Sequence, residues 1–201
     1  MAATGGVGLA GCSGSNEGEP KTTTPGPTPT QPGEPFAVPF RFDVEVQNGQ
    51  PTDRNPPLVK VSVTNEDDMA HSLDTATYQF PFTPTRATTD RGMLSLLTHP
   101  SDWERGECWV GTPITLDAPN GESFDPGGSI TVRRAIMNGT EGRTPQPDVC
   151  WPQDTFLLTE TYALDSSEPG LYDGEEFSWG FWVRVTDTPA IQVGKIQPFK
   201  D

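Results

Sequence analysis

Few residue types in this sequence are suited to acid–base, nucleophilic or metal chemistry, apart from its many carboxylates. The 201-residue chain has two histidines, His71 and His99, and three cysteines, Cys12, Cys108 and Cys150. His71 follows an acidic turn and His99 precedes a proline, so we expect both to be solvated loop residues. The sequence has no Gly-x-Ser-x-Gly elbow, no Cys-x-x-Cys pair and no Gly-rich phosphate loop after a strand. It therefore predicts no catalytic residue, no metal site and no cofactor.

Two acidic segments carry enough oxygen atoms to raise the question of a calcium site. Their oxygen-bearing residues are Asp117, Asn120, Glu122 and Asp125 in the first, and Asp173, Glu175 and Glu176 in the second. Ca²⁺ takes six to eight oxygen ligands in flexible geometry. The spacing is not that of an EF-hand, and a hairpin loop on an acidic surface explains the same residues. We therefore interpret both segments as surface loops.

Cys12 ends the segment 9–12, Leu-Ala-Gly-Cys, which resembles a lipobox, the site where a signal peptide is cut and the new N-terminal cysteine receives a lipid. The resemblance implies that residues 1–12 are a signal-peptide remnant and that Cys12 anchors the protein to a membrane. An export signal begins with positive charge, and no Lys or Arg precedes Cys12. We therefore expect the true start codon to lie upstream. The alternative is a chance match in an Ala/Gly-rich leader.

Residues 13–35 have the composition of a disordered linker, because they contain six prolines and five threonines but almost nothing apolar to bury. The prolines favour an extended stalk of at most about 70 Å, at roughly 3.1 Å per residue. With a lipid on Cys12, this stalk would hold a domain of residues 36–201 away from the membrane surface.

Cys108 and Cys150 remain as an even pair in an exported domain, which favours one disulfide between them. Each stands directly before a tryptophan, Trp109 or Trp151, and we expect one of these to pack against the disulfide. The chain-entropy model gives such a bridge about 4 kcal/mol. Two free buried thiols, or one thiol paired between chains, are the alternatives.

Asn138-Gly139-Thr140 is a sequon for N-glycosylation, which in an exported protein indicates an exposed loop that would accept a glycan.

Trp179 and Trp182 are three residues apart in one predicted strand, so their side chains point to opposite faces of the sheet and at least one should face away from the core. An exposed tryptophan can stack on a sugar ring or anchor a protein partner.

Short alternating apolar patterns run through residues 36–201 and predict strands. These patterns are Phe40–Val46, Val59–Val63, Ala76–Phe82, Ile130–Val132, Phe156–Leu164, Phe177–Val185 and Ile191–Val193. Glu160 falls on the apolar side of its strand. Residues 90–97 are the one segment in which apolar residues could form a helical turn or two.

Seven to nine strands separated by Gly, Pro, Asn and Asp turns predict an all-β fold, an antiparallel β-sandwich. The order of a strand, a Pro-rich turn and a second strand resembles the immunoglobulin-like domains of prokaryotic surface lipoproteins. The second strand ends at Val63-Thr64-Asn65. The same turn resembles that of intracellular proteinase-inhibitor sandwiches. Both resemblances imply a fold and transfer no active site.

The chain carries 28 Asp and Glu against 13 Lys and Arg, a formal net charge of −15. Scattered carboxylates and only four lysines resemble the composition of proteins from halophilic archaea. Polyanions are bound by Lys and Arg, so nucleic acid is excluded as a partner. We expect an exported, lipid-anchored module on the outer face of the cell membrane that binds or has a structural role and is not an enzyme. The alternatives are a solute- or metal-binding accessory lipoprotein and a sandwich-type peptidase inhibitor.

Overall fold

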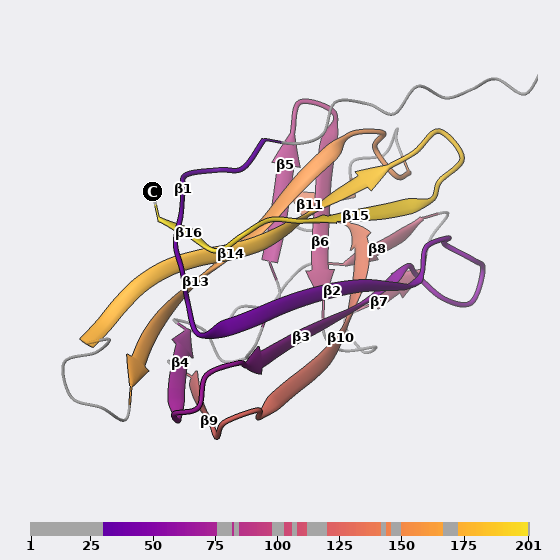
Figure 1. The fold of residues 1–201 in the computed structure, drawn as a ribbon. Helices are drawn as coiled ribbons and strands as arrows, with labels where there is room; N and C mark the ends of the chain where they lie inside the picture. The colour runs from indigo at the N-terminus through magenta and orange to yellow at the C-terminus, as the bar shows by residue number, and fades with distance from the viewer. Residues whose placement is uncertain are drawn as a thin grey trace, which may run out of the picture.

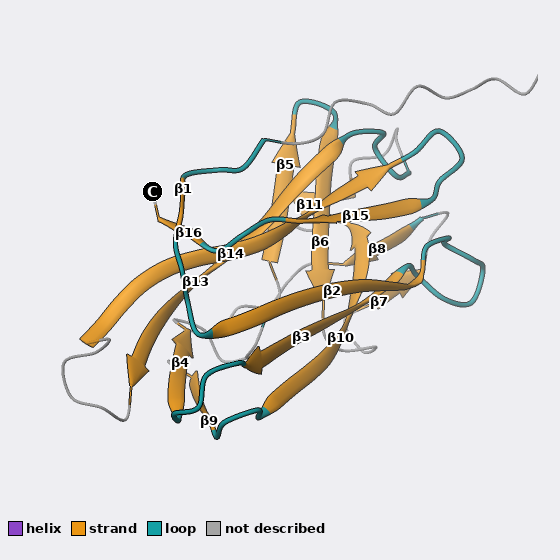
Figure 2. Cartoon of the chain, in the orientation of Figure 1, coloured by secondary structure: helices purple, strands orange, loops and turns teal. Residues whose placement is uncertain are grey.

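The computed structural model describes residues 30–75, 82, 85–97, 103–105, 108–111, 120–141, 144–145, 150–166 and 173–200. All regular structure in these residues is β-strand, so the prediction of an all-β fold is confirmed (Figure 2). The described part has no helix long and apolar enough to cross a membrane. Two larger sheets pack face to face and enclose the core, with a separate two-stranded ladder beside them (Figure 1).

The first sheet has the order β1-β16-β14-β13-β4-β9, and β15 also pairs with β14. Its strands are β1 (Glu34–Pro35), β4 (His71–Thr75), β9 (Asn120–Phe124), β13 (Thr155–Ser166), β14 (Asp173–Val185), β15 (Ile191–Lys195) and β16 (Phe199–Lys200). The long antiparallel pair β13–β14 is its centre, in register from Thr155↔Arg184 to Leu164↔Glu175.

The second sheet has the order β2-β3-β10-β6-β5, with β8 beside β10 and β7 beside β8. Its strands are β2 (Phe40–Asn48), β3 (Leu58–Asn65), β5 (Thr85–Thr89), β6 (Gly92–Leu97), β7 (Trp103–Arg105), β8 (Trp109–Gly111) and β10 (Ser129–Asn138). The separate ladder joins β11 (Thr140–Glu141) to β12 (Thr144–Pro145).

Alternation of apolar and polar residues turns one side of each sheet inward. Phe42 of β2 stacks on Trp179 of β14 with ring centroids 4.8 Å apart, and Tyr162 of β13 stacks on Phe177 at 5.5 Å. Phe40 meets Phe124 edge-on at 5.1 Å. Aromatic side chains from both sheets therefore fill the space between them, and such pairs add to the free energy gained by burial.

Asn65 holds together two of the places where the chain crosses between the sheets. Its side-chain amide is buried and donates to the carbonyl oxygens of Met69, Phe124 and Asp125, while its own carbonyl oxygen accepts from the Asp67 N–H. The β3–β4 turn and the β9–β10 turn are thus fixed by one residue. This is the local reason for the Val63-Thr64-Asn65 ending of β3.

Several local expectations from the sequence are wrong. Residues 90–97 form the end of the β5–β6 hairpin and strand β6, not helical turns. Strand β6 is apolar on both sides because Leu94 and Leu96 face the main core while Leu97 faces a second small cluster with Ala135 and Met137. Such a strand, buried on both faces, loses the alternating pattern that identifies strands in a sequence.

The acidic segment expected to be a hairpin loop includes an edge strand. Asn120 and Glu122 belong to β9, which pairs with β4, and Asp125 begins the turn that follows. Asp173, Glu175 and Glu176 likewise lie in β14. A strand at His71–Thr75 was not expected. Of the strand expected at 76–82, only the buried Phe82 is among the described residues.

Candidate functional site

A groove of about 590 Å³ opens along one edge of the sandwich, where β2 of the second sheet and the segment 191–198 of the first run side by side. At one end the Ile191 N–H donates to the Gly49 carbonyl oxygen, and at the other the Phe36 N–H donates to the Pro198 carbonyl oxygen. These two backbone hydrogen bonds tie the segment 191–198 to the chain on either side of β2. The groove lies between them.

The floor of the groove is aromatic and its walls are polar. Phe40, Phe42 and Trp179 form the floor and are otherwise part of the core. The Trp179 indole N–H donates to the Ile196 carbonyl oxygen at 3.1 Å, which fixes the ring beneath the wall. An apolar floor with a few converging polar groups is the usual composition of a binding site for a small molecule.

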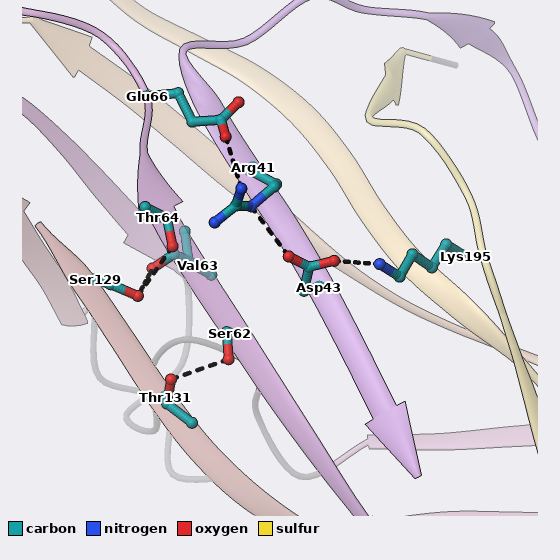
Figure 3. A network of polar contacts seen from close by, with 9 residues as sticks. All are labelled: Arg41, Asp43, Ser62, Val63, Thr64, Glu66, Ser129, Thr131 and Lys195. Atoms are coloured by element: carbon teal, nitrogen blue, oxygen red, sulfur yellow. Dashed lines mark hydrogen bonds and ion pairs between the residues drawn. The ribbon is translucent and has the colours of Figure 1, made fainter. Parts of the chain in front are cut away.

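Four charged side chains form a row across the groove and its rim (Figure 3). Arg41 lies 3.1 Å from Asp43 and 3.1 Å from Glu66, measured between nitrogen and carboxylate oxygen. Lys195 of β15 pairs with the other oxygen of Asp43 and so joins the two sheets. Two cations and two carboxylates cancel, which makes this region neutral in a strongly acidic protein.

Gln31 and Gln197 close one wall of the groove. The Gln31 amide donates to the Gln197 carbonyl oxygen at 2.9 Å, and its side-chain oxygen accepts from the Gln197 N–H at 3.1 Å. Gln31 and strand β1 (Glu34–Pro35) lie in the segment 13–35 that we expected to be a disordered linker, so this expectation is wrong for residues 31–35, which are part of the fold. No pattern in the linker sequence pointed to this role.

Beside the charged row, the outer face of β3 and β10 carries paired hydroxyl groups (Figure 3). Ser62 and Thr131 are 2.9 Å apart, Thr64 donates to Ser129 at 2.9 Å, and Ser129 donates to the Val63 carbonyl oxygen at 3.1 Å. Because these hydroxyls bind one another, this face offers few free polar groups to a ligand.

His71 is a buried strand residue, so its expected position in a solvated loop is wrong. It begins β4, and its Nε2 lies 2.8 Å from Asp67 Oδ2. The hydrogen bond with His71, followed by the one from the Asp68 N–H, lowers the pKa of Asp67 below its usual value of 3.8. The acidic turn that suggested solvation is the element that supplies the histidine with a partner. His99 lies outside the described residues.

A polar cluster lies inside the sandwich, as the position of Glu160 indicated. Arg134 of β10 and Glu160 and Tyr162 of β13 are all buried, and the Arg134 Nε donates to the Phe82 carbonyl oxygen. Burial lowers the pKa of Arg134 to about 10, against the opposing charges of Tyr162 and Glu160. Burial also raises the pKa of Tyr162, and the Glu160 charge adds to that shift. Arg134 had no signal in the sequence, since it sits in an Arg-Arg pair.

Cys108 and Cys150 form the predicted disulfide, with their Cα atoms 5.4 Å apart. Asn138 lies between the two chain segments that the disulfide joins. Its side-chain amide donates to the Trp109 carbonyl oxygen at 3.0 Å, and its side-chain oxygen accepts from the Trp151 N–H at 2.8 Å. Trp151 has a φ of 62°, rare for a residue with a side chain. The Asn138 bond helps to hold it there.

The prediction that Asn138 marks an exposed loop is therefore wrong. Asn138 ends β10 and is 7 % exposed. A glycan on its amide nitrogen would need space that the protein fills and would disturb the bond to Trp109. We therefore expect Asn138 to carry no glycan, because its amide holds the disulfide region.

The tryptophans divide as expected. Trp179 faces the core, whereas Trp182, three residues along β14, lies half-buried on the outer face. Trp151 packs in the main core, and Trp109 lies half-buried between the two apolar clusters, with its indole N–H donating to the Thr52 carbonyl oxygen. Both residues next to the disulfide thus have a packing role.

Within the described ranges, no three His, Cys, Asp or Glu side chains come together in a way that could hold a metal ion. Asp117, Cys12 and the linker up to residue 29 lie outside those ranges. The chain matches no protein-family model, no curated protein and no solved structure.

Proposed function

We propose that this protein is a membrane-tethered binding module on the outside of the cell, and that it binds through the groove between β2 and the segment 191–198. The observation that carries the proposal is the groove itself: an aromatic floor, a neutral charged rim and a volume of about 590 Å³, within the usual range for ligand sites. The lipobox at Cys12 and the Pro/Thr-rich segment 13–30 would supply the tether.

The chemistry of the groove favours a small solute with an apolar body and a polar end. The aromatic floor would bury the apolar part, and the Lys195–Asp43 pair would exchange partners with the polar part. Exposed ion pairs contribute little free energy, so opening this one costs little. We assign no catalytic step to the groove.

Thermal-shift and calorimetric titrations of the full chain in molar salt test this proposal. The probes are amino acids, sugars, calcium and other divalent ions. A probe at 100-fold its dissociation constant stabilises by about 2.7 kcal/mol. We expect Lys195→Ala to reduce the shift given by any probe that binds in the groove. Lys60→Ala is the matched control, because Lys60 pairs with Glu45 away from the groove. If no probe shifts the wild type, or if both variants respond alike, the groove proposal fails.

We also propose that the mature protein begins at a lipid-modified Cys12, and that it belongs to the surface lipoproteins of halophilic archaea. Mass spectrometry of protein isolated from its native membrane tests the first part. The expected N-terminal peptide starts at Cys12 and carries a lipid mass. Recovery of an intact peptide covering residues 1–12 would refute the anchor without affecting the groove.

A further inference from the structure

The outer face of the first sheet carries a tryptophan among small and hydroxyl-bearing residues. Inward residues of β14 are buried, so the alternate residues face outward, Trp182 among them. In the register, Leu157 of β13 and Gly194 of β15 lie on either side of Trp182. We name this surface the Trp182 face; it consists of Leu157, Thr159, Thr161, Ser178, Trp182 and Gly194.

None of these six residues is a carboxylate, although the chain has 28 Asp and Glu, and the nearest carboxylate on the same side of β14 is Glu176, two residues before Ser178. Thr161 and Ser178 are paired at 3.1 Å. Arg184 borders the face, and its Nε donates to the Thr155 hydroxyl. The outer face of the second sheet is different, since β2 and β3 present Arg41, Asp43, Glu45 and Lys60. The Trp182 face is therefore a neutral interruption in the acidic surface, suited to a neutral partner.

The indole of Trp182 has an unsatisfied donor. Its Nε1 is shielded from solvent, and it has no hydrogen-bond acceptor in the structure. A buried donor without a partner costs about 1–3 kcal/mol. A small rotation of the ring outward would let this N–H reach water or a ligand, so a ligand that offers an acceptor is favoured.

Glycine keeps the approach to the ring open. Gly194 is exposed, and a Cβ at this position would meet only the Trp182 Cβ, at 3.9 Å. Gly180 precedes Trp182 by two residues on the same side of β14 and brings no side chain either. No side chain at position 194 of β15 therefore lies against the tryptophan.

We propose that the Trp182 face binds neutral carbohydrate chains. The negative face of the indole attracts the polarised C–H groups of a pyranose ring. The exposed Thr159 hydroxyl has no hydrogen-bond partner among the described residues, and a hydroxyl both donates and accepts, as sugar hydroxyls require. A partner with charge would not need an acid-free surface. This site is separate from the groove, and the inference does not depend on the proposed function.

The test is isothermal titration of the full chain with maltohexaose, cellohexaose, xylohexaose and mannohexaose. We expect at least one to bind, and Trp182→Ala to weaken that binding at least about tenfold, the usual loss at an aromatic centre of an interface. Gly194→Leu should weaken it similarly while keeping the tryptophan, because the new side chain covers the ring and has room to fit. Thr131→Leu, on the outer face of the second sheet, is the matched control and should bind as the wild type does.

Two results would overturn the proposal. The first is that none of the four hexasaccharides binds, or that binding survives in both Trp182→Ala and Gly194→Leu. The second is that light scattering shows a dimer that Trp182→Ala dissociates, which would make this face a contact between copies. Circular dichroism and thermal unfolding of each variant establish that a loss of binding is not a loss of fold.

Discussion

At the scale of single residues, two side-chain amides hold together parts of the chain that are far apart in sequence. Asn65 joins the β3–β4 turn to the β9–β10 turn, and Asn138 joins the two segments that flank the disulfide. Both amides are buried and use a donor and an acceptor. Replacing such a group leaves its partners without a hydrogen bond, which costs more than the bond itself contributed.

Asn138→Ala should therefore destabilise the domain. Two backbone groups, the Trp109 carbonyl and the Trp151 N–H, would lose their partner. We expect the free energy of unfolding to fall by about 2 kcal/mol and the Tm by roughly 4–8 °C, measured by thermal and urea unfolding.

Thr140→Ala removes the sequon but retains Asn138, and the mass of the protein isolated from its native host should change only by the mass of the substitution. A larger loss of mass would show that Asn138 is glycosylated.

Tyr162 should keep its proton until the protein unfolds. Burial raises its pKa above the ordinary 10.0, so above pH 10 the folded state holds a proton that the unfolded state releases. The contribution of Tyr162 to the free energy of unfolding is fully present below pH 10 and decreases as the pH rises further. Absorbance at 295 nm follows tyrosine ionisation and does not detect Arg134. Wild type and Tyr162→Phe should titrate alike until alkaline unfolding, where only the wild type gains one more tyrosinate; an extra tyrosinate before unfolding would contradict this.

At the scale of strands, alternation located the long strands with one apolar side and missed the short β4, which carries His and Asp, as well as β6 and β9. Strands β2, β3, β13 and β14 lie where the patterns predicted them. Strand β6 was mistaken for helical turns because it is buried on both sides. Strand β9 was mistaken for a loop, since an edge strand of polar and acidic residues has the composition of a turn.

The candidate sites were even less accessible from sequence. The pair of cysteines left after Cys12 predicted the disulfide. The alternation of side chains along β14 predicted that Trp182 faces outward if Trp179 faces the core. The groove depends on Arg41, Asp43 and Lys195 meeting across 152 residues of chain. No local pattern predicts a contact between sheet edges that only the packing of two sheets brings together.

The Cys108–Cys150 bridge should stabilise the segment that carries β8. Strand β8 lies beside β10, and Trp109 covers the small cluster of Leu97, Ala135 and Met137. The bridge closes a loop with a sequence separation of 42, for which chain entropy predicts about 4 kcal/mol. The Cys108→Ser, Cys150→Ser double variant should show that loss in urea unfolding. Adding reductant should lower the Tm of the wild type and leave the double variant unchanged; an unchanged wild type would refute the stabilising role.

At the scale of the whole molecule, charge is distributed unevenly. The net charge is −15, yet the groove rim is balanced and the Trp182 face has no carboxylate. Repulsion among the remaining carboxylates acts against the compact state. Salt shortens the Debye length from about 10 Å at 0.1 M to about 3 Å at 1 M and so weakens this repulsion.

The Tm should therefore rise between 0.1 M and 2 M NaCl. A variant with Glu34→Gln, Glu122→Gln and Glu176→Gln removes three exposed carboxylates that have no ion-pair partner in the part of the chain that the structure describes. Its Tm should be higher than that of the wild type at low salt and rise less with NaCl, as measured by calorimetry. An equal salt response in both proteins would show that salt acts through hydration and not through charge screening.

The short β1–β16 ladder has a mechanical consequence. It consists of two residue pairs, Glu34↔Lys200 and Pro35↔Phe199, and β16 in turn lies against β14 (Figure 1). A pulling force applied through the residues before Gln31 first reaches the hydrogen bonds between Gln31 and Gln197 and then this ladder. A force applied at Trp182 reaches β14 in the same sheet. The load then runs through one sheet only, while the aromatic interior carries none of it. Under tension the domain would yield first by releasing Gln31 and peeling off β1, a small extension that removes one wall of the groove and leaves the Trp182 face folded.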